Sequence, residues 1–175
     1  MDGGSKVQPD SKVVETNLAG ISNILKNQAA DFYFLQEVDI DAKRSFHINE
    51  RAYYEKALDM SSIYACNFKC VFCALSDSTI GKVEAGLLTM TDYQVESAKR
   101  IKLAESFSWP IKTCNLKRCM LETRIPIEGT DKELVLINFH LEAYDSGEGK
   151  KIQSRMLADK LQEEYKAGNY VIAGG

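Results

Sequence analysis

The stretch Asp31-Phe-Tyr-Phe-Leu-Gln-Glu-Val38 is a short apolar run rich in aromatic residues. Its length and aromatic content are typical of a buried strand. Gln36 and Glu37 stand near the end of the run and Asp39 follows it, so that polar groups gather where the strand ends.

These carboxylates are candidates for a metal site. A carboxylate at the end of a buried strand can face a ligand, and Mg²⁺ often takes only one or two carboxylates together with water and substrate phosphate. Glu37 suits that role. The alternative is that Glu37 and Asp39 are solvated residues at the start of a loop, since short motif matches are common.

A second apolar run that ends in polar residues is Val135-Leu-Ile-Asn-Phe-His-Leu-Glu-Ala-Tyr-Asp145. His140 follows an apolar strand and is itself followed by polar residues. A His or Asn at a strand end can donate hydrogen bonds to a phosphoryl oxygen as negative charge develops there. The alternative for His140 is a partly buried histidine bonded to a backbone carbonyl.

The rest of the chain alternates between helical and strand-like stretches. Apolar residues at three- and four-residue spacing predict helices over 11–28, 45–58 and 149–165. The first has the apolar face Val14, Leu18, Ile21 and Leu25, the second turns Tyr53 and Leu58 to the core, and the third has the apolar face Ile152, Met156, Leu157 and Leu161. Gly168-Asn169 is expected to end the third helix.

Strand-like composition covers 64–75, 86–90, 93–100, 119–127, 134–139 and 170–173. Thr91-Asp92 predicts a turn that joins the second and third of these strands into a pair. Thr130-Asp131-Lys132 suits a hairpin loop. Tyr170-Val-Ile-Ala173 is expected to begin another buried strand, and the C-terminus resembles a truncation because natural domains seldom finish on a strand.

Composition narrows the class of protein. The 175 residues are 45% hydrophobic and 27% charged, which suits one globular domain or a large part of one. The net charge of −3 gives no reason to expect non-specific binding of nucleic acid. No apolar run approaches the roughly 20 residues of a membrane span, and the N-terminus has no signal-peptide pattern. The odd number of cysteines, five, predicts reduced thiols and favours the cytoplasm.

Cys66-Asn-Phe-Lys-Cys70-Val-Phe-Cys73 supports a different hypothesis. This spacing is the one by which radical S-adenosylmethionine enzymes bind a [4Fe–4S] cluster through three thiolates. The segment reads as a strand, however, in which Cys66 and Cys70 would share a face and Cys73 would point the other way. The alternative is that small apolar cysteines fill strand positions.

Taken together, the LQEVD and NFHLEAYD segments, the helix with Gln153 and the final YVIAGG resemble the endonuclease/exonuclease/phosphatase superfamily. The likeness runs through nearly the whole chain and includes the GLLTM and LKRCML segments. It implies an α/β fold, a sandwich of two sheets with outer helices, of which residues 1–175 would be one partial domain holding roughly the first sheet. It also implies hydrolysis of phosphate mono- or diesters assisted by Mg²⁺ or Mn²⁺.

The resemblance assigns roles to four residues. Glu37 matches the metal-binding glutamate, and His140 matches the histidine that contacts the scissile phosphate. Asn138 stands in the same segment and would support His140. Arg118 lies where some members place a phosphate contact, with a surface Arg on a strand edge as the alternative. The substrate could be a nucleic acid, a lipid head group or a small phosphate ester.

Departures from the family pattern predict little or no hydrolysis by this chain alone. Family members begin with a strand whose Asn shares the metal, and nothing strand-like precedes the first helix here. The Gly-Asp-x-Asn motif and the later Asp-His pair that polarises water would lie beyond Gly175. A binding module without chemistry is therefore a further alternative.

Overall fold

The computed structural model describes residues 9–73, 80–109 and 115–175. Within them the chain forms three α-helices, one 3₁₀ turn and seven strands. In chain order the elements are α1 (Ser11–Gln28), β1 (Phe32–Asp39), η1 (Lys43–Ser45), α2 (Glu50–Leu58), β2 (Ser62–Cys73), β3 (Gly81–Thr91), β4 (Ser97–Lys102), β5 (Cys119–Pro126), β6 (Glu133–Phe139), α3 (Glu148–Ala167) and β7 (Tyr170–Gly174).

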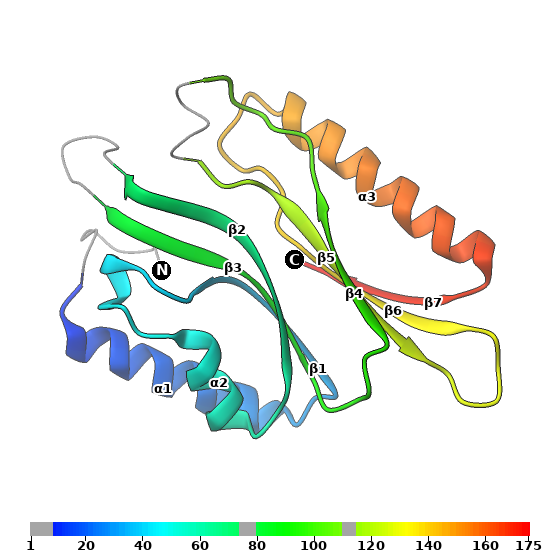
Figure 1. The fold of residues 1–175 in the computed structure, drawn as a ribbon, viewed down its shortest axis with the longest axis horizontal. Coiled ribbons are helices and arrows are strands. Elements are labelled where there is room, and N and C mark those ends of the chain that lie inside the picture. Colours follow the sequence, from blue (N-terminus) through cyan, green and yellow to red (C-terminus); the bar gives the residue numbers. More distant parts are fainter. Residues whose placement is uncertain (1–8, 74–79, 110–114) are drawn as a thin grey trace.

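The strands form two sheets with helices on their outer faces, so the α/β sandwich predicted from the sequence is confirmed (Figure 1). The first sheet has the order β1-β3-β2, and both outer strands run antiparallel to β3. The second has the order β4-β5-β6-β7, in which only β7 is parallel to its neighbour, because α3 carries the chain back along the sheet. The described chain therefore contains strands of both sheets, not mainly of the first.

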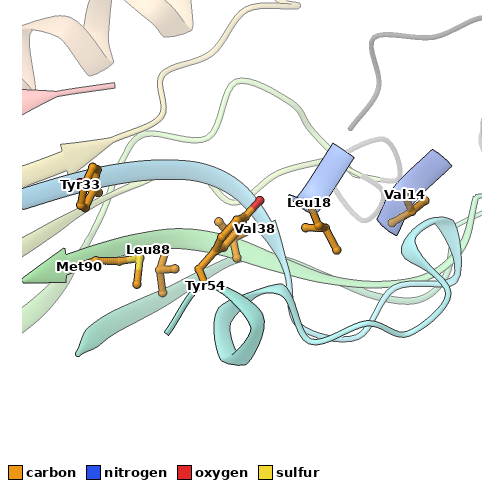
Figure 2. Close-up of a cluster of buried hydrophobic side chains, with 7 residues drawn as sticks. All are labelled: Val14, Leu18, Tyr33, Val38, Tyr54, Leu88 and Met90. Carbon is orange, nitrogen blue, oxygen red and sulfur yellow. The ribbon is translucent and has the colours of Figure 1, made fainter. Parts of the chain in front are cut away.

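Helices α1 and α2 cover the outer face of the first sheet (Figure 1). Their apolar faces meet residues of β1 and β3 in one buried cluster (Figure 2), made of Val14, Leu18, Tyr33, Val38, Tyr54, Leu88 and Met90. The predicted apolar face of the first helix is confirmed, since its four residues all belong to this cluster or pack against it. Tyr53 and Leu58 also pack against it, as predicted.

Two further layers complete the sandwich. Ala65, Leu87, Cys119 and Leu121 are buried between the two sheets. On the outer face of the second sheet, α3 packs over a cluster made of Leu103, Met120, Val135 and Ile137. Gly168 ends α3 in the left-handed conformation at φ 78°, as the sequence predicted. No helix in the described ranges combines the length and the apolar character that crossing a membrane would require.

The predicted pairing of the strands on either side of Thr91-Asp92 is wrong. Strand β3 already has β1 on one edge and β2 on the other, so no edge is left for the strand that follows it. The chain instead crosses to the second sheet, where β4 begins at Ser97 and pairs with β5. The hairpin predicted through Thr130-Asp131-Lys132 is confirmed, because β5 and β6 pair antiparallel around it.

Three smaller predictions are also wrong. The second helix begins at Glu50, because Phe46 and His47 both have left-handed backbone angles that a helix cannot include. Ile152 is 48% exposed, whereas Met156, Leu157 and Leu161 do pack against the core. Strand β7 is not buried, since Tyr170 is 65% exposed on the edge of its sheet.

Candidate active site

Glu37 lies in a β-bulge near the end of β1. Leu35 pairs with Leu88 and Val38 with Gly86, so that two residues of β1 oppose one residue of β3. The extra residue shifts the alternation of side chains, and Val38 therefore packs under the helices as Tyr33 does. Glu37 has a φ of 58°, which is rare for a residue with a Cβ. The bulge redirects the glutamate away from the regular strand faces.

Glu37 and His140 come together although they belong to different sheets. The Oε1 atom of Glu37 is 3.8 Å from Nε2 of His140. Both side chains line one open pocket of about 510 Å³. Its lining residues are Ile21, Phe34, Leu35, Gln36, Glu37, Val38, Glu50, Tyr54, His140 and Gly175.

The surroundings of His140 favour its neutral form. Burial lowers the pKa of His140, and the charge of Arg118 lowers it further, whereas Glu37 and Glu142 act in the opposite direction. Its Nδ1 atom is buried and has no hydrogen-bond partner among the described residues. The ring is therefore not fixed by a backbone carbonyl at that nitrogen. A neutral imidazole carries one donor and one acceptor nitrogen, so it can give one hydrogen bond to a phosphoryl oxygen.

Asn138 stands two residues before His140 and is completely buried. Its Nδ2 donates to the carbonyl oxygens of Leu35 and Leu88, at 3.2 and 3.0 Å. Its Oδ1 accepts a hydrogen bond of 2.8 Å from Nε2 of Gln36. All of these partners belong to the first sheet, so Asn138 ties the strand that carries His140 to the strand that carries Glu37.

Arg118 precedes β5 and is not a surface residue, since it is only 4% exposed. Its guanidinium forms a buried ion pair with Glu142, with Nη2 3.3 Å from Oε1. The same carboxylate accepts hydrogen bonds from the backbone N–H groups of Ala143 and Tyr144. Gln153 of α3 accepts a hydrogen bond from the N–H of Glu142. Arg118 thus helps to hold the loop that follows His140.

The structure adds two pocket residues that the sequence did not single out, Glu50 and Tyr54. Both lie on α2 and are buried. Glu50 stands directly after the helix N-cap, Asn49, and an acidic residue there is a known helix-start signal. That signal could have placed the beginning of α2, but not the burial of Glu50.

Asp39 is buried as well and is not part of a solvated loop. Its carboxylate forms an ion pair with Arg44, in which Nη2 is 2.9 Å from Oδ1. The two side chains are 1% and 7% exposed. The solvated-loop alternative is therefore wrong for Asp39.

The pocket has one partly exposed side-chain carboxylate, that of Glu37, next to the ring of His140. Glu37 keeps a third of its side chain exposed and offers a carboxylate next to a phosphate-binding candidate, His140. Within the described ranges, no group of three or more His, Cys, Asp or Glu residues could hold a metal ion. A cation bound by Glu37 would therefore take most of its ligands from water and substrate oxygens, as Mg²⁺ often does.

The structure does not support the hypothesis that the cysteine motif binds an iron–sulfur cluster. Cys66 and Cys70 lie on β2, which pairs along its length with β3 and contains two bulges. The described cysteines, Cys66, Cys70 and Cys119, are free thiols. The side chain of Cys73 lies outside the described residues. This arrangement does not favour an iron–sulfur cluster.

Comparison with known proteins finds relatives only at the level of fold. No family model matches the chain, and no curated protein matches it significantly. Among solved structures, an endonuclease/exonuclease/phosphatase from Beutenbergia cavernae DSM 12333 is similar with a TM-score of 0.64 at 19% identity, covering 81% of this chain and 38% of that one. Truncated TDP2 from Caenorhabditis elegans gives 0.58 at 20% identity, covering 88% and 51%. The human Nocturnin catalytic domain with bound sulfate gives 0.63 at 15% identity, covering 91% and 55%.

These matches define the class of fold. The two sheets and outer helices of this chain have the endonuclease/exonuclease/phosphatase fold, as the resemblance of the two motif segments implied. The chain spans between 38% and 55% of the length of the three solved chains.

Proposed function

We propose that this chain carries part of the catalytic pocket of a phosphoester hydrolase that uses Mg²⁺ or Mn²⁺. The observation that carries the proposal is the approach of Glu37 to His140, 3.8 Å apart across the two sheets. A carboxylate and a neutral imidazole that line one pocket would supply a metal ligand and a phosphate hydrogen-bond donor next to each other.

Glu37 would hold the cation. When bound, a divalent cation polarises a phosphoryl oxygen and stabilises the leaving oxygen. His140 would donate a hydrogen bond to a non-bridging oxygen, and burial, which lowers the pKa of its ring, favours the neutral form for that role. Asn138 would act through His140 and not on the phosphate, because its amide is committed to the first sheet.

Arg118 has a smaller part in this proposal. Its Nη1 atom is buried without a hydrogen-bond partner among the described residues. Two of its other nitrogens, however, bond to Glu142. We therefore infer that Arg118 orders the loop after His140 and adds positive potential near the phosphate site.

We propose a single-stranded nucleic acid as the first substrate class to test. One relative, TDP2 from D. rerio, is described as a complex with a single-strand DNA product, and another, ANGEL2, as a 2',3'-cyclic phosphatase. The net charge of −3 argues against long duplex DNA, which is bound through many basic residues. Lipid head groups and small phosphate esters remain comparison substrates.

We propose that turnover by this chain is slow. The described residues that line the pocket include two side-chain carboxylates, Glu37 and Glu50, and no Asp–His pair of the kind that activates water. Catalysis of this type depends on a complete and preorganised set of groups. Binding of metal and phosphate is therefore the sharper test, and hydrolysis is the second.

The experiment titrates Mn²⁺ into the full chain by electron paramagnetic resonance, and then measures hydrolysis of a 5′-labelled single-stranded oligonucleotide. Glu37→Gln should weaken Mn²⁺ binding by about tenfold or more. His140→Gln should leave Mn²⁺ binding unchanged and lower any hydrolysis about 100-fold. Glu163→Gln on the exposed face of α3 is the matched control. Equal Mn²⁺ binding by the wild type and Glu37→Gln would contradict the proposal.

A further inference from the structure

The conformation of Glu37 needs support from its surroundings. A left-handed backbone is unfavourable for a residue with a Cβ, and such residues persist only where neighbouring contacts hold them. The bulge also removes Gln36 and Glu37 from the regular ladder between β1 and β3. The position of the glutamate therefore depends on side-chain contacts next to it.

One group of such contacts comes from the second sheet. The Nε2 atom of Gln36, the residue directly before Glu37, donates to Oδ1 of Asn138 at 2.8 Å. The Nδ2 atom of Asn138 donates to the carbonyls of Leu35 and Leu88, which form the last regular pair before the bulge. Asn138 is fully buried, so these hydrogen bonds do not compete with water.

The same asparagine also fixes the position of the histidine. Asn138 lies on β6, and His140 follows two residues later, directly after the strand ends. The backbone N–H of His140 is still attached to the sheet, since it donates to the carbonyl of Cys119. Holding Asn138 against β1 therefore sets the distance between the end of β6 and the bulge.

We propose that Gln36 and Asn138 are positioning residues that hold Glu37 against His140, and we name this pair the inter-sheet clamp. The inference rests on the proposed function for the purpose of the pocket. Neither residue of the clamp is assigned to touch metal or phosphate. Its role is to keep the carboxylate of Glu37 and the imidazole of His140 at a fixed distance. Hydrogen bonds to metal ligands often orient those ligands in the same way.

The test uses Gln36→Met, which keeps the size of the side chain and removes its donor. Val135→Ala is the control, because Val135 is buried on β6, the strand of Asn138, but packs in the cluster under α3. Both variants should lose stability, and only Gln36→Met changes a residue of the clamp. Gln36→Glu, which also removes the donor, is the second variant if Gln36→Met does not fold.

The first measurement needs no metal. The chain has two histidines, so a long-range ¹H–¹⁵N spectrum shows two imidazoles, and a His47→Gln variant assigns them. Gln36→Met should shift the ring signals of His140 and leave those of His47 in place, whereas Val135→Ala should shift neither. Unchanged His140 signals in Gln36→Met would overturn the inference.

The second measurement is the Mn²⁺ titration. Gln36→Met should raise the dissociation constant about tenfold, while Val135→Ala should leave it at the wild-type value. If the wild type binds Mn²⁺ through Glu37 and Gln36→Met binds it equally well, the clamp inference fails. If the wild type shows no binding that depends on Glu37, the proposed function fails, and the imidazole signals alone decide the clamp.

Discussion

The backbone N–H of Asp39 donates a hydrogen bond of 3.0 Å to the buried carboxylate of Glu50. This contact joins the last residue of β1, two positions after Glu37, to the first residue of α2. The second oxygen of Glu50 is buried and has no hydrogen-bond partner among the described residues. Burial raises the pKa of Glu50 to about 7, although the hydrogen bond from Asp39 lowers it.

Glu50 should make the protein less stable as the pH rises. With a folded-state pKa of about 7 against an ordinary value of 4.5, the folded chain binds more protons than the unfolded chain between these limits. The free energy of unfolding therefore falls as the pH rises from 4.5 to 7, and the contribution of Glu50 no longer changes at higher pH. Glu50→Gln should remove this fall and be more stable than the wild type at pH 8 by about 2 kcal/mol. Urea unfolding at several pH values measures this, and an unchanged slope in the variant would refute it.

Glu37→Gly should increase stability and abolish metal binding. Glycine adopts the left-handed backbone without a Cβ clash, so the substitution should raise the free energy of unfolding by about 1 kcal/mol. The carboxylate is lost at the same time. Urea unfolding and the Mn²⁺ titration measure the two effects. Glu37→Gln separates them, because it loses the carboxylate and keeps the backbone strain. A Glu37→Gly variant that is less stable than Glu37→Gln would refute this account of the bulge.

Thr123→Val should stabilise the protein. Thr123 lies on β5 and is fully buried, and its hydroxyl has no hydrogen-bond partner among the described residues. Valine has the same shape and buries no polar atom, so we expect a gain of about 1 kcal/mol in the free energy of unfolding. Thr130→Val is the control, because the hydroxyl of Thr130 is exposed and bonds to the carbonyl of Ile127. Thermal and urea unfolding of both variants test this difference.

Glu164 should support the fold down to low pH. Although its burial opposes ionisation, hydrogen bonds from Lys160, Asn169 and Arg124 lower the pKa of Glu164 to about 2. This contribution is complete above pH 4.5 and is lost as the pH falls towards 2. Glu164→Gln should cost about 3 kcal/mol at pH 7 and should weaken the dependence of stability on pH below 4.5. Glu163→Gln, one residue away and exposed, should change neither quantity.

Some of this structure could be predicted because the signal is local. The apolar run before Glu37, the apolar faces of α1 and most of α3, and the stop at Gly168 each lie within one segment, where spacing and backbone preference determine the outcome. The two strand ends with polar residues were recognisable for the same reason. Their meeting in one pocket followed from the resemblance of their order along the chain to a known fold.

Other features depend on partners far away in sequence. The partner of β4 was missed because the sequence does not show that both edges of β3 are occupied. Arg118 was open to a surface interpretation because its ion-pair partner, Glu142, lies 24 positions away and has no local signature. The hydrogen bond between Gln36 and Asn138 spans 102 positions, and no periodicity predicts such a contact.

The long sequence separation between Gln36 and Asn138 affects when the pocket forms during folding. Closing a loop of this length is entropically costly, and contacts far apart in sequence form late in folding. A molecule in which each sheet had formed, but the two had not yet docked, would have its strands and helices and still lack the pocket. Mn²⁺ binding would then report the docking of the two sheets during refolding, at a time when circular dichroism already shows native secondary structure.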